Sequence, residues 1–331
     1  GSLKTQKDDP VHYGHKYSWL VRLVHWGTSW VAPVDVQRVE TTLTDSQIAS
    51  VQVKELDQRN PKPKVVVADS LYANHLFLAV FLVVQNVFAL VRLRSNQVFY
   101  GQPKPHPQGT KGAPAKHGFK FKLSEPSRLP DQSETFLLGE QTVTLRAWHG
   151  LHLKKLPALV GMVLQVEFFR ADGTPRYKRP MWLFWTGPET VALSELCRMY
   201  LWRFAIEHLF RFLKQHLGLN ANQSTDLVST DQWMWFCALA YWQLLLMQDE
   251  IPNARPAWYP AQSAQREKRM TPGQVQRGAF CFLEQLGTPA QPTRTAGKGK
   301  GRSKGYHPVP RQRFPVVKKA KPTSDQAVRA T

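Results

Sequence analysis

Residues 65–74 read VVVADSLYAN, and this short stretch sets the fold class. Val65 to Ala68 form an all-apolar run, which is typical of a strand that is buried on both faces. The run ends at Asp69. Residues 71–84 are apolar and predict a helix, and residues 87–93 return as a strand.

Upstream of this run, the sequence predicts a hairpin followed by a helix. Residues 17–26 (YSWLVRLVHW) alternate in polarity and are rich in β-branched and aromatic side chains, and residues 29–39 read as a second strand. The helix begins at Thr44 and ends before Pro61. This order of elements predicts an α/β domain with a mixed sheet and flanking helices.

Downstream, the chain changes character. Gly, Pro, Lys and His dominate residues 101–130, and three β-like stretches follow at 135–148, 160–169 and 179–185. We interpret residues 101–190 as a β-rich insertion that is not part of the first sheet. Residues 194–217 then predict one long helix, capped by Ser194 and stopped by Gly218.

The rest of the chain is predicted to hold one more long helix and a tail. Residues 231–249 are mostly apolar, so we expect a buried helix. After residue 251 prolines recur, and only residues 274–286 look helical. The predicted division is therefore residues 1–100 for the first part of the α/β domain, 101–190 for the insertion, 191–250 for its C-terminal helices, and 251–331 for a largely flexible basic tail.

Charge is the outstanding feature of the composition. The 331 residues hold 44 Lys+Arg against 24 Asp+Glu, so the net charge is +20, which predicts a polyanionic partner such as nucleic acid. Residues 288–331 contain eleven Lys/Arg and one acid, Asp325, and so carry half of this excess. Three widely spaced cysteines exclude a disulfide framework and a thiolate zinc site, and indicate a reduced, intracellular compartment. The longest apolar run, residues 76–84, is far short of the ~20 residues of a membrane helix.

The strongest chemical feature is the predicted helix 200–214, YLWRFAIEHLFRFLK. At ~100° per residue, Tyr200, Arg203, Glu207 and Lys214 fall within an arc of about 60°. A carboxylate flanked by two cations suits a hard divalent metal and the phosphates around it. The alternative is a solvated helix face, with Arg203 and Glu207 as an i,i+4 pair.

Asp69 is the second candidate, because it ends a buried strand where α/β folds place functional groups. Two carboxylates, one at a strand end and one on a late helix, suit the two-metal arrangement of a nuclease. The alternative for Asp69 is the N-cap of the following helix.

The spacing Tyr200-x2-Arg203-x3-Glu207-x6-Lys214 resembles the YREK signature of bacterial insertion-sequence transposases of the DDE type, and VVVADSLYAN is similar to their second catalytic strand. The resemblance covers roughly residues 13–305 and implies an RNase H-like fold interrupted by a β-rich insertion. It also implies that Asp69 and Glu207 bind Mg²⁺, with Mn²⁺ as a substitute, and that Tyr200, Arg203 and Lys214 hold DNA phosphates. The implied partner is double-stranded DNA, both transposon ends and target, bound by a homodimer in the bacterial cytoplasm at the nucleoid.

The first Asp of this family lies on a strand that precedes the hairpin, and none is predicted before Tyr17. We expect that Asp upstream of residue 1, with Asp9 as the weaker candidate and Asp35 as a further one. Residues 1–331 alone are then expected to bind DNA without cutting it. Two other functions stay open, a catalytically inactive DNA-binding remnant and a cellular RNase H-like nuclease.

Further DNA contacts are implied by the resemblance or suggested by charge. Trp182 precedes the signature helix, where hairpin-forming relatives stack a Trp on a flipped base; the alternative is a core Trp. Arg92 and Arg94 resemble a basic DNA-contacting segment, or are a surface pair whose stems cover apolar surface. The tail also contains four cations spaced by small residues, Lys298, Lys300, Arg302 and Lys304. They resemble an arm that binds the minor groove of DNA; the alternative is that they only keep the chain soluble.

Overall fold

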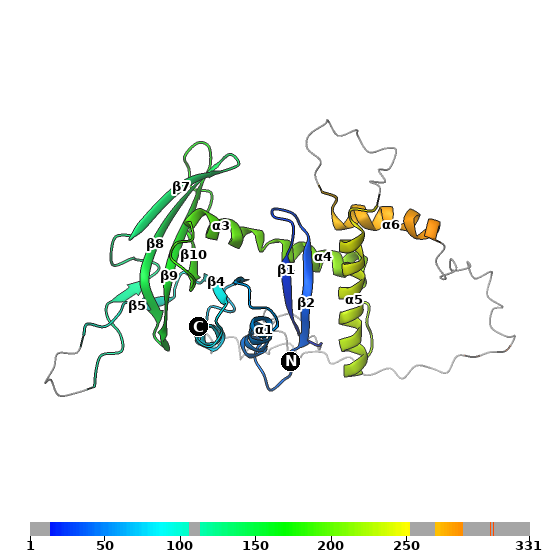
Figure 1. Cartoon of the computed structure of the whole chain (residues 1–331), viewed down its shortest axis with the longest axis horizontal. Helices are drawn as coiled ribbons and strands as arrows, with labels where there is room; N and C mark the ends of the chain where they lie inside the picture. Colours follow the sequence, from blue (N-terminus) through cyan, green and yellow to red (C-terminus); the bar gives the residue numbers. More distant parts are fainter. Residues whose placement is uncertain (1–13, 106–112, 252–268, 287–304, 306, 308–331) are drawn as a thin grey trace, which may run out of the picture. The chain divides into compact units, whose positions relative to one another are not determined.

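The computed structural model describes residues 14–105, 113–251, 269–286, 305 and 307 (Figure 1). Contacts divide the chain into two compact units, Gly1–Gln285 and Leu286–Thr331, and the fold is that of the first. Its strands are β1 Tyr17–Leu23, β2 Val31–Arg38, β3 Lys64–Ala68, β4 Val87–Leu93, β5 Val98–Tyr100, β6 Lys120–Lys122, β7 Gln132–Leu138, β8 Gln141–Leu153, β9 Leu156–Phe169 and β10 Met181–Trp185. Its helices are α1 Asp45–Arg59, α2 His75–Leu78, α3 Leu193–Trp202, α4 Ala205–His216, α5 Leu227–Met247 and α6 Pro272–Leu286, with a 3₁₀ helix at Ala79–Leu82.

The predicted hairpin is confirmed, but it forms a sheet of its own. β1 and β2 pair antiparallel from Tyr17–Arg38 to Leu23–Val31, and neither pairs with another of the described strands. One face packs on α4 and α5. The other faces α1, where Ser18 donates a hydrogen bond of 2.7 Å to the buried Gln52. The expectation of one mixed sheet that includes the hairpin is therefore wrong in this detail.

The main sheet has eight strands in the order β3-β4-β10-β9-β8-β5-β6, with β7 paired to β8. β3 and β4 are parallel, and the other pairs are antiparallel, so the predicted mixed α/β sheet with flanking helices is confirmed. The segment 101–190 was expected to lie outside the first sheet. Instead β10 pairs with β4, Trp182 opposite Leu93, because its apolar residues find neighbours on both sides.

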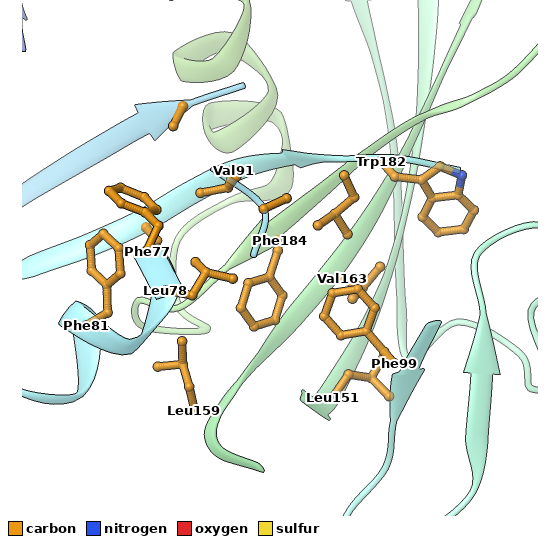
Figure 2. Close-up of a cluster of buried hydrophobic side chains, with 14 of the residues drawn as sticks. Phe77, Leu78, Phe81, Val91, Phe99, Leu151, Leu159, Val163, Trp182 and Phe184 are labelled. Atoms are coloured by element: carbon orange, nitrogen blue, oxygen red, sulfur yellow. The ribbon is translucent and has the colours of Figure 1, made fainter. Parts of the chain in front are cut away.

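Each face of the main sheet carries its own core. Alternate residues of β4, such as Val91 and Leu93, pack with α1, α2 and the 3₁₀ helix in the cluster shown in Figure 2. Leu90 faces the opposite side, where α3 covers the sheet. The helix predicted at 71–84 begins later in the structure. Asn74 caps the start of α2, because its side-chain oxygen accepts hydrogen bonds from the N–H groups of Leu76 and Phe77.

The helix predicted at 194–217 is two helices in the structure. α3 packs on the main sheet and α4 packs on the hairpin, and Arg203 and Phe204 form the break between them (Figure 1). Because the two sheets are separate, the chain changes helix where it passes from one core to the other. The N-cap is Ala192 rather than Ser194, whereas Gly218 ends α4 as predicted, with φ +67°.

α5 is hydrophobic all round, and only part of its surface is buried. Tyr241, Leu244 and Leu245 pack with α4, α6 and β2. Phe236, Leu239 and Leu246 are 62%, 53% and 70% exposed, so the expectation of a buried helix is confirmed for one side of α5 and wrong for the other. Val275 and Ala279 of α6 are buried in the same core, which places part of the predicted tail in the folded unit. Among the described helices, none has the length and apolarity that a bilayer span requires.

Candidate functional site

Asp69 lies at the carboxyl end of β3, beside the end of β4. The parallel register pairs Ala68 with Val91, so Asp69 and Arg92 are the next residues along the two strands. Val65 and Val67 face α3, and strand alternation places Asp69 on this same face. Arg92 follows Leu90 on that face and is exposed. An acid and a guanidinium therefore share one corner of the sheet, below α3.

The Asp69 carboxylate forms a local turn and leaves an oxygen for another partner. Its Oδ1 accepts the backbone N–H of Leu71 at 2.8 Å, while Oδ2 makes no hydrogen bond within the described ranges. Asn74, not Asp69, caps α2, so the N-cap alternative for Asp69 is wrong. The carboxylate also contributes to the raised pKa of Tyr72, whose main cause is burial.

α3 brings Tyr200 onto the same face of the sheet. Tyr200 is buried in the core formed by α3 and by strand residues that include Val65, Val67 and Leu90. Its hydroxyl is buried, and it has no hydrogen-bond partner in the part of the chain that the structure describes. Burying a hydroxyl without a partner costs free energy, so such groups are uncommon and point to an absent partner.

Arg203 lies in the break between α3 and α4, against Tyr200. Its guanidinium carbon is 5.7 Å from the centre of the Tyr200 ring, a cation–π contact. Its Nε is also buried and, as far as the structure describes the chain, unbonded. The backbone here makes i→i+3 bonds, from Arg203 N–H to Tyr200 C=O at 3.1 Å and from Glu207 N–H to Phe204 C=O at 3.0 Å. Short 3₁₀ stretches within a helix often mark functional positions.

Glu207 and Lys214 lie beyond the break, on α4. Glu207 is in the first turn, where the helix dipole favours a carboxylate, and Lys214 is in the last turn, where it favours a cation. Both side chains are exposed. The predicted single stripe of four residues is therefore divided between two helices. The alternative Arg203–Glu207 ion pair does not occur among the ion pairs that the structure describes.

The donor set suits a hard divalent cation, although the described residues include no cluster of three metal-ligating side chains. Asp69 and Glu207 offer carboxylate oxygens, the ligands that Mg²⁺ prefers. Asp35 faces α1, where it accepts hydrogen bonds from Gln52 at 2.9 Å and Gln37 at 2.8 Å. It thus lies on the opposite side of the hairpin from α4, which carries Glu207. Asp9 lies outside the described residues.

The structure separates the other predicted contacts. Trp182 is 1% exposed, and its ring centre is 5.6 Å from that of Trp148 (Figure 2 shows it in the core). Core side chains cover the Trp182 ring, so it cannot stack on a base in this position. The alternative of a core tryptophan is therefore the one that the structure supports. Arg92 and Arg94 are exposed. The four cations of the predicted arm lie outside the described residues: Lys298, Lys300, Arg302 and Lys304.

A pocket beside the α3–α4 break contains aromatic residues that the sequence did not single out. It measures about 630 Å³, and its lining includes Trp26 of the β1–β2 turn, Phe204 of the break, Arg198 and His208. Trp26 and Phe204 are each 56% exposed, and the lining includes no acidic residue. One signal was present in the sequence: Phe204 is an aromatic residue that falls outside the apolar arc of the helix.

Nucleophilic catalysis by cysteine has no support at this site. Cys197 of α3 is buried against the main sheet, and burial raises the pKa of its thiol to about 12. It is therefore protonated at neutral pH, and only the thiolate is a nucleophile.

A comparison with protein families gives an independent result. A family model described as a transposase DDE domain matches residues 14–243 of this chain. No curated protein matches it. The match covers more than half of the chain and includes β3, the main sheet, the α3–α4 break and most of α5. The chain therefore belongs to the transposase DDE domain family, with the RNase H-like fold that the signature residues implied.

Proposed function

We propose that this domain cuts transposon ends and joins them to target DNA in a cut-and-paste reaction that depends on Mg²⁺. The family supports DNA transposition in general. One observation carries the finer proposal: Asp69 follows β3 on the sheet face where α3 packs Tyr200, and Arg203 lies against the Tyr200 ring. Tyr200 and Arg203 each have a buried polar group without a partner among the described residues. This shared face supports a site that combines carboxylates with donors for phosphate.

Asp69 and Glu207 are the residues that would hold the metal. Asp69 offers Oδ2, since Oδ1 is engaged with Leu71, and Glu207 offers an exposed carboxylate. When bound, divalent ions activate the attacking water or hydroxyl and stabilise the leaving oxygen. Mn²⁺ would serve at the same oxygen ligands. A third carboxylate stays a prediction.

The DNA backbone would be held by donors around these carboxylates. The Tyr200 hydroxyl and the Arg203 Nε–H lack partners in the described structure, and phosphate oxygens would satisfy both. Arg92, next to Asp69 at the strand ends, would bind a further phosphate, with Arg94 beyond it. Lys214 would contact phosphate from the last turn of α4.

The pocket beside the break would receive an unpaired base. Trp26 and Phe204 offer exposed rings, and stacking of a base on an aromatic residue contributes ~1–3 kcal/mol. Arg198 and His208 add positive or hydrogen-bonding groups for the attached phosphates. Trp26 and Phe204 would thus supply the base stacking that the resemblance implied for Trp182.

The experiment tests metal binding directly, so it does not depend on complete cutting activity. Fe²⁺ is bound in place of Mg²⁺, and peroxide with ascorbate then cleaves the polypeptide next to the ion. We expect fragments that end near residues 69 and 207. Asp69→Asn or Glu207→Gln should abolish them, while Glu195→Gln, an exposed carboxylate on the first turn of α3, should not.

DNA binding and cutting complete the test. Glu207→Gln should bind a short random-sequence duplex as tightly as the unaltered chain in a mobility-shift assay, because one exposed carboxylate is not needed for binding. Any Mg²⁺-dependent nicking of a supercoiled plasmid should disappear in this variant, and nicking that persists would contradict the assignment. DNA binding without localised Fe²⁺ cleavage would favour the alternative, a remnant that binds DNA and no longer cuts.

A further inference from the structure

The turn between β1 and β2 carries Trp26 to the pocket beside the α3–α4 break. The ring centre of Trp26 is 4.7 Å from that of Trp202 on α3, and the side chain is 56% exposed. It lines the pocket together with Phe204. Among the described aromatic rings it pairs with Trp202 alone, so the direction of Trp26 depends on the backbone that bears it.

The backbone immediately before Trp26 is strained. His25 has φ +56°, and within the described ranges it is the only residue other than glycine with a positive φ. The left-handed region is unfavourable for a residue with a Cβ atom, so such a conformation persists only where the surrounding structure holds it. Strained residues of this kind gather at functional sites, where they fix a geometry that the site needs.

A hydrogen bond from the end of α5 holds His25 in place. Gln248, the C-cap of α5, donates from its side-chain Nε2 to Nε2 of His25 at 2.9 Å. An amide nitrogen can only donate, so the imidazole accepts and is neutral, with its proton on Nδ1. Burial, with a smaller contribution from Arg269, lowers the pKa of His25 and favours this neutral form. Gln248 is itself buried, so it is a fixed support for the strained residue.

The other end of the turn is fixed as well. The N–H of Thr28 donates to the C=O of His25 at 3.0 Å and closes a turn with Trp26 and Gly27 at its centre. Trp202 Nε1 then donates to the C=O of Thr28 at 3.2 Å. Trp26 is thus placed by a turn whose two ends are bonded to different helices, to α5 at His25 and to α3 at Thr28.

We propose that His25 is a positioning residue for this pocket: together with Gln248 it holds the turn in the shape that directs the Trp26 ring to the pocket, ready to stack on an unpaired base. A ring that is already fixed in its bound orientation loses less conformational entropy when the base binds, which strengthens binding. The inference rests on the proposed role of the pocket, but the placement of Trp26 can be measured without DNA.

Fluorine NMR of the full chain, labelled with 5-fluorotryptophan, measures this placement. The Trp26 resonance is identified by its absence in Trp26→Phe. Gln248→Leu removes the hydrogen bond to His25 and should shift or split that resonance. Gln243→Leu is the matched control, because it makes the same change at an exposed position of the same helix, and it should leave the resonance in place. An unchanged Trp26 resonance in Gln248→Leu would overturn the proposal. Circular dichroism checks that Gln248→Leu is folded, and His25→Ala replaces it if it is not.

DNA binding tests whether the placement serves the pocket. The preference for a duplex with an unpaired base near its end over a fully paired duplex should fall about fivefold in Gln248→Leu, the low end of what base stacking contributes. Affinity for the paired duplex should stay the same. His25→Asn should keep more of the preference than His25→Ala, because asparagine adopts the left-handed region more readily.

A double variant separates positioning from a general loss of structure. Added to Trp26→Ala, Gln248→Leu should cause no further loss of preference, because His25 and Gln248 act through Trp26. A further loss in the double variant, or an equal loss of affinity for both duplexes in Gln248→Leu, would overturn the positioning role. An unaltered chain with no preference for the unpaired base would instead contradict the proposed base pocket, whereas the fluorine spectrum alone decides whether Gln248 and His25 place Trp26.

Discussion

The guanidinium of Arg203 lies over the ring of Tyr200, 5.7 Å from its centre, at the break between α3 and α4. Tyr200 itself packs on the sheet face of Val65 and Val67, the face on which strand alternation places Asp69. The contact leaves two buried donors, the Tyr200 hydroxyl and the Arg203 Nε–H, without a partner within the described residues. Two such groups side by side cost stability in the free protein and would gain partners when a phosphate binds.

Tyr200→Phe should therefore change stability and DNA affinity in opposite directions. Removing a buried hydroxyl that lacks a partner should raise the free energy of unfolding by about 1 kcal/mol, as measured by urea denaturation. The same change should weaken binding of a short duplex, because a phosphate contact is lost. Tyr17→Phe is the control: its hydroxyl donates to Asp231 at 2.7 Å, so its loss should destabilise the protein. A less stable Tyr200→Phe would contradict the prediction.

Asp69→Asn should separate folding from metal binding. The asparagine side-chain oxygen can still accept the N–H of Leu71, so we expect a change of less than about 0.5 kcal/mol in the free energy of unfolding. Asp69→Ala also removes this turn and should cost about 1 kcal/mol. Both should lose Mn²⁺ binding in calorimetry, because the charge is gone. Equal Mn²⁺ affinity of Asp69→Asn and the unaltered chain would exclude Asp69 as a ligand.

Trp182 and Trp26 should respond to truncation in contrasting ways. Trp182→Ala leaves a cavity in the core and should lower the free energy of unfolding by about 3–5 kcal/mol. Trp26→Ala removes an exposed ring whose centre is 4.7 Å from that of Trp202, and should cost about 1 kcal/mol or less.

Their effects on DNA binding should be reversed. Trp26→Ala should weaken binding to a duplex with an unpaired base near its end more than binding to a fully paired duplex. If Trp182→Ala instead folds with normal stability and loses this preference, Trp182 is the stacking residue after all.

These two tryptophans show what the sequence could and could not predict. Trp182 lies in the run PMWLFWTG, and a local pattern cannot tell a buried strand from a binding strand. Trp26 becomes part of a pocket only because the β1–β2 turn meets α3 and α4, which are distant in sequence. The strand that ends at Asp69, by contrast, was predictable, because four apolar residues before an acid form a local signal.

The break at Arg203 was not predictable for a similar reason. The stretch LWRFAI contains no Gly or Pro, so nothing local interrupts the helix. The interruption arises because α3 and α4 pack on separate cores. The pairing of β10 with β4 likewise joins residues about ninety positions apart, beyond the reach of local periodicity.

His152 should make the fold less stable in acid. It is fully buried in β8, with Nε2 3.0 Å from His117 Nδ1, and burial together with His117 lowers its pKa. The unfolded chain then binds protons at a higher pH than the folded chain, so stability is full above about pH 6.5 and falls below it. Melting temperatures between about pH 7.5 and 5.5 measure this. His25, whose pKa burial also lowers, adds in the same direction.

His152→Gln should flatten this pH dependence, whereas His208→Gln, at an exposed histidine, should leave it unchanged. An unaltered slope in His152→Gln would assign the acid sensitivity to other groups.

The tail should add affinity for DNA of any sequence. Residues 288–331 carry eleven Lys/Arg and one acid, and each phosphate that a cation neutralises releases a counterion. Replacing Lys298, Lys300, Arg302 and Lys304 by Gln should therefore reduce the slope of log affinity against log salt by up to about 3.6, at ~0.9 per contact. Removing residues 288–331 should reduce it further, while the preference for the transposon's own end changes little.

Because Arg92→Gln removes one contact at the proposed site, it should lower the slope by about 0.9 and serves as the reference for a single phosphate. A slope that the deletion leaves unchanged would show that the tail does not touch DNA and that its charge serves another purpose.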